Sequence, residues 1–111
     1  MKITQRQVGT VDVLAPAGAL VDEDAANFCT QLQRRLQSVN SRVVVSLQEV
    51  QYLDSIALEG LLNAADELEA QAARLKLANV NQTCREVFEL TGISHRFAIF
   101  ADIQDAVRSF L

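Results

Sequence analysis

The stretch from Val43 to Leu62 joins an apolar run to an amphipathic helix, and it constrains the fold more than any other part of the chain. The run Val43–Leu47 opens with three consecutive valines, and its short length between polar flanks predicts a buried strand. Apolar residues then recur with the spacing of one helical face, which predicts a helix over residues 56–73. The residues of this face are Leu58, Leu61, Leu62, Ala65, Leu68 and Ala72.

Tyr52-Leu53-Asp54-Ser55 connects this strand to this helix. Asp and Ser both favour the N-cap position, where a side-chain oxygen accepts a hydrogen bond from a free backbone N–H. If Ser55 is the cap, its role is structural. If Asp54 is the cap, Ser55 lies in the first turn and points outward. In either case a hydroxyl and a carboxylate lie at the electropositive end of a helix, which makes this the place to look for function.

An N-terminal hairpin is predicted by two short β-prone runs, Ile3–Gln7 and Val11–Leu14. Gly9 lies between them and can adopt the backbone geometry of a tight turn. Pro16 and Gly18 are expected to end the second strand.

A helix is then expected to begin at Asp22-Glu23-Asp24, because acidic residues stabilise a helix N-terminus. Residues 38–41 end this helix and lead into the strand at Val43. The apolar stripe of the helix comprises Ala25, Phe28, Cys29, Leu32 and Leu36.

Downstream of residue 73, a weakly alternating run over residues 75–80 predicts another strand. Thr83-Cys84-Arg85-Glu86 has the pattern of a capping box, in which the Thr and Glu side chains satisfy free N–H groups at a helix start. Gly92 is suited to cap the C-terminus of this helix. The side chains expected to face inward are Val87, Phe88 and Leu90.

The chain ends with a predicted strand over residues 97–101 and a helix capped by Asp102. The element order is therefore ββαβαβαβα, in one α/β domain over residues 1–111. Strands that alternate with helices imply a mostly parallel central sheet, to which the hairpin adds an antiparallel N-terminal edge strand.

Composition excludes several classes of function. The net charge of −4 and the lack of any Lys/Arg cluster argue against a nucleic-acid surface, so that proteins are the expected partners. No apolar stretch approaches the roughly 20 residues that span a bilayer. The first seven residues, MKITQRQ, lack the apolar segment of a signal peptide, so a cytoplasmic location is expected.

An enzymatic function is not expected. The four glycines are scattered and form no phosphate-binding loop, and Ser55 has no GxSxG context. His95 is the single histidine and lies in no cluster with metal-ligand spacing, so neither a metal nor a cofactor is predicted. Cys29 and Cys84 have no CxxC spacing and are interpreted as core thiols in a reducing compartment, with a redox pair as the less favoured alternative.

The segment Glu49–Leu61, EVQYLDSIALEGL, resembles the D-S motif of STAS domains, the family typified by bacterial anti-sigma factor antagonists. Three positions differ from the family pattern. Ser46 ends the central strand where Asp is usual, Val21 stands at the aspartate of a G-x-L-D segment and is followed by Asp22, and Ala57 replaces a glycine. The resemblance extends over nearly the whole chain, through Gly18–Asp22, Leu75–Val80, Val87–Ile93, Phe97–Phe100 and Asp102–Ala106.

This resemblance implies a STAS-like fold and a non-enzymatic protein-binding function. In the family, the serine of the D-S motif is phosphorylated by an anti-sigma factor that is also a serine kinase with a histidine-kinase-like ATPase domain. That role falls on Ser55, and the implied partner-binding residues are Asp22, Asp54, Ser55, Ile56, Ala57 and Leu58. An alternative is a STAS accessory subunit of a bacterial lipid-transport ABC system, in which the same helix start docks on an ATPase and Ser55 need not be phosphorylated.

Overall fold

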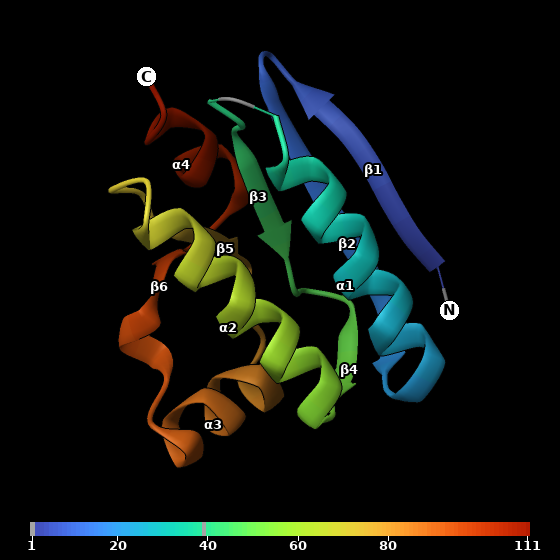
Figure 1. The fold of residues 1–111 in the computed structure, drawn as a ribbon. Helices are drawn as coiled ribbons and strands as arrows, with labels where there is room; N and C mark the ends of the chain where they lie inside the picture. Colours follow the sequence, from blue (N-terminus) through green and yellow to red (C-terminus); the bar gives the residue numbers. More distant parts are fainter. Residues whose placement is uncertain (1, 39) are drawn as a thin grey trace.

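A computed structural model describes residues 2–38 and 40–111. Met1, and Val39 within the predicted connection 38–41, lie outside the described residues. The strands and helices follow one another along the chain as shown in Figure 1, with a short 3₁₀ helix, Ser94–Arg96, before the last strand. They are β1 (Lys2–Val8), β2 (Val11–Leu20), α1 (Asp22–Leu36), β3 (Val43–Ser46), β4 (Val50–Leu53), α2 (Ser55–Glu69), β5 (Leu75–Ala78), α3 (Gln82–Thr91), β6 (Phe97–Phe100) and α4 (Ile103–Arg108).

The strands form one mixed sheet in the order β1-β2-β3-β5-β6, and β4 pairs with β2 beyond the end of β3. β1 and β2 are antiparallel and joined by a tight turn, because Val8 pairs with Val11 and Gly9 has a positive φ of 63°. All other strand pairs are parallel. The predicted α/β class, the N-terminal hairpin and the mostly parallel sheet are confirmed.

The connection between the central strand and α2 contains a strand, β4, that the sequence did not predict. β2 is correspondingly longer than predicted: residues 12–14 pair with β3 and residues 18–20 pair with β4. The prediction that Pro16 and Gly18 end β2 is therefore wrong. Pro16 pairs with Ile3 of β1 and lies between the segments of β2 that pair with β3 and β4, so its missing N–H interrupts neither of the two parallel ladders.

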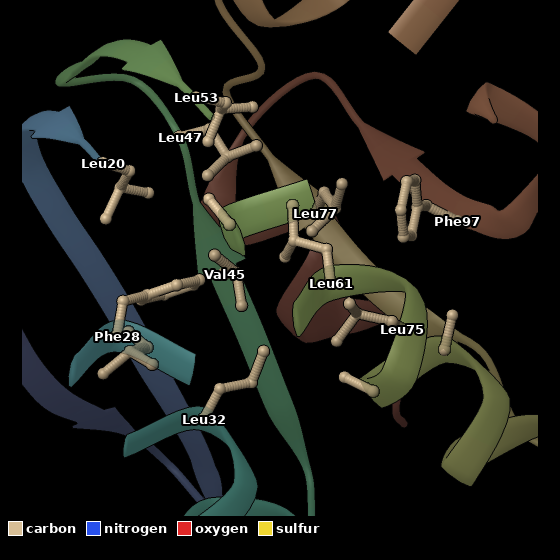
Figure 2. Close-up of a cluster of buried hydrophobic side chains, with 14 of the residues drawn as sticks. Leu20, Phe28, Leu32, Val45, Leu47, Leu53, Leu61, Leu75, Leu77 and Phe97 are labelled. Atoms are coloured by element: carbon tan, nitrogen blue, oxygen red, sulfur yellow. The ribbon is translucent and has the colours of Figure 1, made fainter. Parts of the chain in front are cut away.

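The sheet has a hydrophobic core on each face. The larger core lies beneath α1, α2 and α3, and the part of it shown in Figure 2 includes Phe28, Val45, Leu61 and Leu77. The smaller core lies beneath α4 and includes Val44, which follows from the alternation of side chains along β3. The remaining buried members of the smaller core are Val11, Val13, Ala78 and Ala106.

Details of two helices differ from the predictions. α2 ends at Glu69 rather than at residue 73, and Ala72 is exposed with a φ of 59°. The N-cap of α3 is Asn81, whose side chain accepts a hydrogen bond from the N–H of Cys84. The prediction of a capping box that begins at Thr83 is therefore wrong. Leu90 is 87% exposed and does not face inward as predicted.

Candidate functional site

The first turn of α2 presents Ser55 to solvent. Asp54 is the N-cap of this helix, and its Oδ1 accepts a hydrogen bond of 3.0 Å from the N–H of Ala57. Asp54 rather than Ser55 therefore satisfies the helix start, which decides between the two alternatives that the sequence left open. The Ser55 hydroxyl is exposed and, within the described part of the chain, makes no hydrogen bond.

A second hydrogen bond ties Asp54 to the start of α1. β2 and β4 are parallel neighbours in which Leu20 pairs with Leu53, so the helices that follow these strands begin side by side. The N–H of Asp22 donates to Oδ2 of Asp54 over 2.7 Å. The N-cap of α1 is Val21, whose side chain makes no cap hydrogen bond. Asp54 supplies the missing acceptor, and one carboxylate caps both helices.

These two hydrogen bonds lower the pKa of the Asp54 carboxyl from its ordinary value of 3.8. The largest cause is the hydrogen bond from the N–H of Ala57, and the next is the bond from the N–H of Asp22. Both donors stabilise the charged form, because a carboxylate accepts these bonds more strongly than a carboxylic acid does. Asp54 is therefore ionised at neutral pH.

Replacing Asp54 with alanine is expected to lower the free energy of unfolding by about 1.5 kcal/mol, because the start of each helix loses an acceptor. Asp54→Asn should cost about half as much, since its amide oxygen can still accept one bond. Urea denaturation of the three proteins at pH 7 measures both values. Glu59→Ala, at an exposed position of the same helix, is a control that should change stability little.

The pH dependence of this effect follows from the direction of the pKa shift. A carboxyl whose pKa is lower in the folded state stabilises the protein fully above its unfolded value, here 3.8, and less as pH falls through the folded pKa. The stability difference between wild type and Asp54→Asn should therefore shrink below about pH 4. A difference that stays constant down to pH 2 would contradict the double-cap role.

α1 and α2 pack closely just behind this site. The Cys29 thiol of α1 donates to the backbone carbonyl of Ile56 over 3.6 Å. Burial raises the pKa of this thiol and the nearby Asp54 carboxylate raises it further, so Cys29 is a neutral thiol that can donate. Gly60 lies against it, since a Cβ at Gly60 would come within 2.0 Å of the Cys29 sulfur. Both cysteines are free thiols, and burial raises the pKa of Cys84 to about 11.

The predicted site residues differ in exposure. Asp22 and Ser55 are exposed, Ile56 is 41% exposed, and Asp54 and Leu58 are half-buried. Ala57 is fully buried, so the methyl group at the position of the family's glycine points into the core and not toward the surface at Ser55.

Tyr52 was absent from the predicted site although it is 53% exposed on the strand that leads to Ser55. Its aromatic ring and Ile56 give the site apolar surface beside its acids. The residue could have been found only by predicting β4, because its orientation follows from the pairing of β4 with β2.

The neighbourhood of Ser55 is acidic. Asp22, Glu23 and Asp24 occupy the first turn of α1, beside the carboxylate of Asp54.

Among residues 2–38 and 40–111 no three His, Cys, Asp or Glu residues are grouped so that they could hold a metal ion. No helix within the same ranges is long and apolar enough to cross a membrane.

A family model described as "STAS domain" matches residues 2–106. BtrV of Bordetella bronchiseptica, which carries the name of an anti-sigma factor antagonist, is 24% identical over 110 residues, which are 99% of this chain and 95% of that protein. The structure is also similar to that of an anti-sigma-factor antagonist (STAS) domain protein from Planctomyces limnophilus, with a TM-score of 0.83 and 22% identity over 98% of this chain and 97% of that chain.

The anti-sigma factor antagonist SpoIIAA has been solved in two forms, and both are similar to this structure. The unphosphorylated form has a TM-score of 0.79 and 21% identity, covering 98% of this chain and 96% of that chain. The phosphorylated form, from Bacillus, has a TM-score of 0.75 and 19% identity, covering 99% of this chain and all of that chain. At these identities the structural likeness concerns the fold, which agrees with the fold that the sequence predicted.

Proposed function

Because the chain belongs to the STAS domain family, we propose that it is a protein-binding module switched by phosphorylation of Ser55, acting as an anti-sigma factor antagonist in a partner-switching pathway. The observation that carries the proposal is the exposed Ser55 hydroxyl, which makes no hydrogen bond within the described chain, at a helix start fixed by Asp54. The name of the relative BtrV and the two forms of SpoIIAA support it.

The proposed partner is an anti-sigma factor that is also a serine kinase, with a histidine-kinase-like ATPase domain. Its docking surface is the start of α1 and α2, with acidic Asp22, partly exposed Asp54, and apolar contacts from Ile56 and Tyr52. Leu58 and Ala57 lie beneath this surface and hold its shape. Apolar and charged side chains occur together in specific protein interfaces.

Ser55 is the acceptor of a phosphate in this proposal and does not act as a nucleophile toward a small substrate. A catalytic serine needs a general base within hydrogen-bond reach, and no described side chain accepts a hydrogen bond from Ser55. The chain is thus the substrate of its partner's kinase activity, and binding is its own activity.

Affinity capture from a lysate of the source cells, followed by mass spectrometry of both the captured protein and the bait, tests the proposal. The expected result is an ATPase with serine kinase activity that, once purified, phosphorylates the wild-type chain but not Ser55→Ala. Ser38→Ala, which removes a different exposed serine, should be phosphorylated like wild type. Capture of a transporter ATPase with Ser55 unmodified would overturn the switch and favour the accessory-subunit alternative.

A further inference from the structure

A cavity of about 350 Å³ opens at the end of the sheet opposite to Ser55. The two places are separated by the length of α2, whose 15 residues span roughly 20 Å. The volume of the cavity lies at the lower end of the range that small-molecule sites have. The apolar lining comes from the ends of α1 and α2, the starts of β3 and β6, and the C-terminal segment, and includes Leu36, Val43, Leu68, Ala73, Ala98 and Phe110.

Three cationic residues lie in or next to this apolar lining. Arg74 and Lys76 line the cavity, and Arg42 lies beside it with its guanidinium carbon 6.0 Å from the ring centroid of Phe110. The Nζ of Lys76 lies 3.5 Å from the same centroid and donates to the hydroxyl of Ser109 over 2.8 Å. No acidic residue is among the described residues that line the cavity.

The three cations have only neutral partners in the described chain. Arg74 donates to two backbone carbonyls, and Arg42 donates to a threonine hydroxyl over 3.0 Å. None of the three forms an ion pair within residues 2–38 and 40–111, although the chain has 14 acidic and 10 basic residues. Burial lowers the pKa of Lys76, and the positive charge of Arg42 lowers it further. The cavity thus holds positive charge that the protein leaves unbalanced.

We propose that this cavity binds a small amphiphilic anion, a carboxylate with a medium-length acyl chain, whose chain lies on the apolar lining and whose carboxylate lies between Arg42 and Lys76. The carboxylate would remove the mutual repulsion of the two cations and accept charge-assisted hydrogen bonds from both. Burying the acyl chain against leucine, valine and alanine side chains contributes the hydrophobic part of the affinity. A neutral lipid or a small polar anion satisfies one half of the site only.

Titration of the ¹⁵N-labelled protein with octanoate, followed by amide chemical shifts, tests this proposal. The expected shifts concentrate at residues 74–76 and at Ala98, with none at Ser55. Octan-1-ol, which lacks the charge, and acetate, which lacks the chain, should each bind at least roughly tenfold more weakly. Equal affinity for octanol and octanoate would overturn the role of the cations.

Variants locate the binding site. Lys76→Gln and Arg42→Gln should each weaken octanoate binding by about tenfold, as expected for the loss of one charge-assisted contact. Ala98→Leu should reduce binding by filling the cavity. Arg6→Gln also removes one positive charge, but at an exposed position of β1, and this variant should bind octanoate like wild type. The proposal is overturned if octanoate fails to bind the wild-type protein, or if folded Lys76→Gln and Arg42→Gln bind as well as wild type.

Discussion

Phosphorylation of Ser55 is expected to weaken the binding of the partner kinase by about a hundredfold, which corresponds to roughly 2.7 kcal/mol. A phosphate adds about −1.5 to −2 charges at neutral pH, and here it joins an already acidic surface formed by Asp22, Glu23 and Asp54. When a partner docks, this charge must be desolvated or placed against other acids, which costs several kcal/mol.

The fold itself should survive this modification. A phosphate at a helix N-terminus lies near free N–H groups and the positive end of the helix dipole, which favours it by roughly 0.3–1 kcal/mol. Ser55 is exposed, so no side-chain packing is lost. The melting temperature of the phosphorylated protein should therefore remain within a few degrees of that of the unmodified protein.

Calorimetry of the purified pair measures the affinity change. Ser55→Ala should bind the partner tightly, and its affinity should not fall after incubation with the kinase and ATP. Ser55→Asp should weaken binding only in part, because one carboxylate carries less charge than a phosphate. Equal affinity for the phosphorylated and unphosphorylated proteins would exclude the switch, even if the kinase modifies Ser55.

Gly60→Ala is expected to lower the free energy of unfolding by about 2 kcal/mol. Alanine is by itself the better helix former, by up to about 1 kcal/mol. The added methyl group, however, would lie 2.0 Å from the sulfur of Cys29 and 3.0 Å from its Cβ, which forces α1 and α2 apart. At these distances steric overlap outweighs helix propensity. Urea denaturation measures the net effect.

Removing the opposing sulfur tests this explanation directly. Cys29→Ala in the Gly60→Ala background should recover at least half of the lost stability, because the closest contact disappears while the Cβ contact at 3.0 Å remains. Cys29→Ala alone loses a weak hydrogen bond to the carbonyl of Ile56 and should cost less than the glycine substitution. If the double variant is as unstable as Gly60→Ala, the cause lies elsewhere.

Local sequence signals predicted the elements whose structure depends on local chemistry. The valine run correctly predicted β3, and the acidic residues Asp22–Asp24 correctly predicted the start of α1. Gly92, with a φ of 71°, caps the C-terminus of α3 as expected. Asp102 caps α4 by accepting from the N–H of Asp105. The start of α2 at Asp54 and Ser55 was also predictable, because these two residues precede a clear apolar helical pattern.

The elements that were missed depend on distant partners. β4 has only four residues, and just its two end residues are buried, so it shows no alternation. It is a strand because it extends along the far half of β2. The sequence predicted Thr83, not Asn81, as the N-cap of α3. The side-chain amide of Asn81 donates to the backbone carbonyls of Leu47 and Val50, and no local pattern reveals these distant contacts.

The error at Leu90 has a geometric cause. Phe88 is buried in α3, and a residue two positions later on a helix lies about 200° around the axis. Leu90 therefore points to solvent whenever Phe88 points to the core. Helical periodicity, and not apolar character alone, decides which face of α3 this residue occupies.

The hydrogen bonds from two helix starts to one carboxylate also bear on how fast and how tightly a partner can associate. Because the backbone N–H groups of Asp22 and Ala57 both donate to the Asp54 carboxylate, the proposed docking surface is held in one arrangement in the free protein. Association then loses little conformational entropy, and a larger share of the contact energy appears as affinity. We therefore expect phosphorylation of Ser55 to change the charge of the proposed docking surface more than its shape.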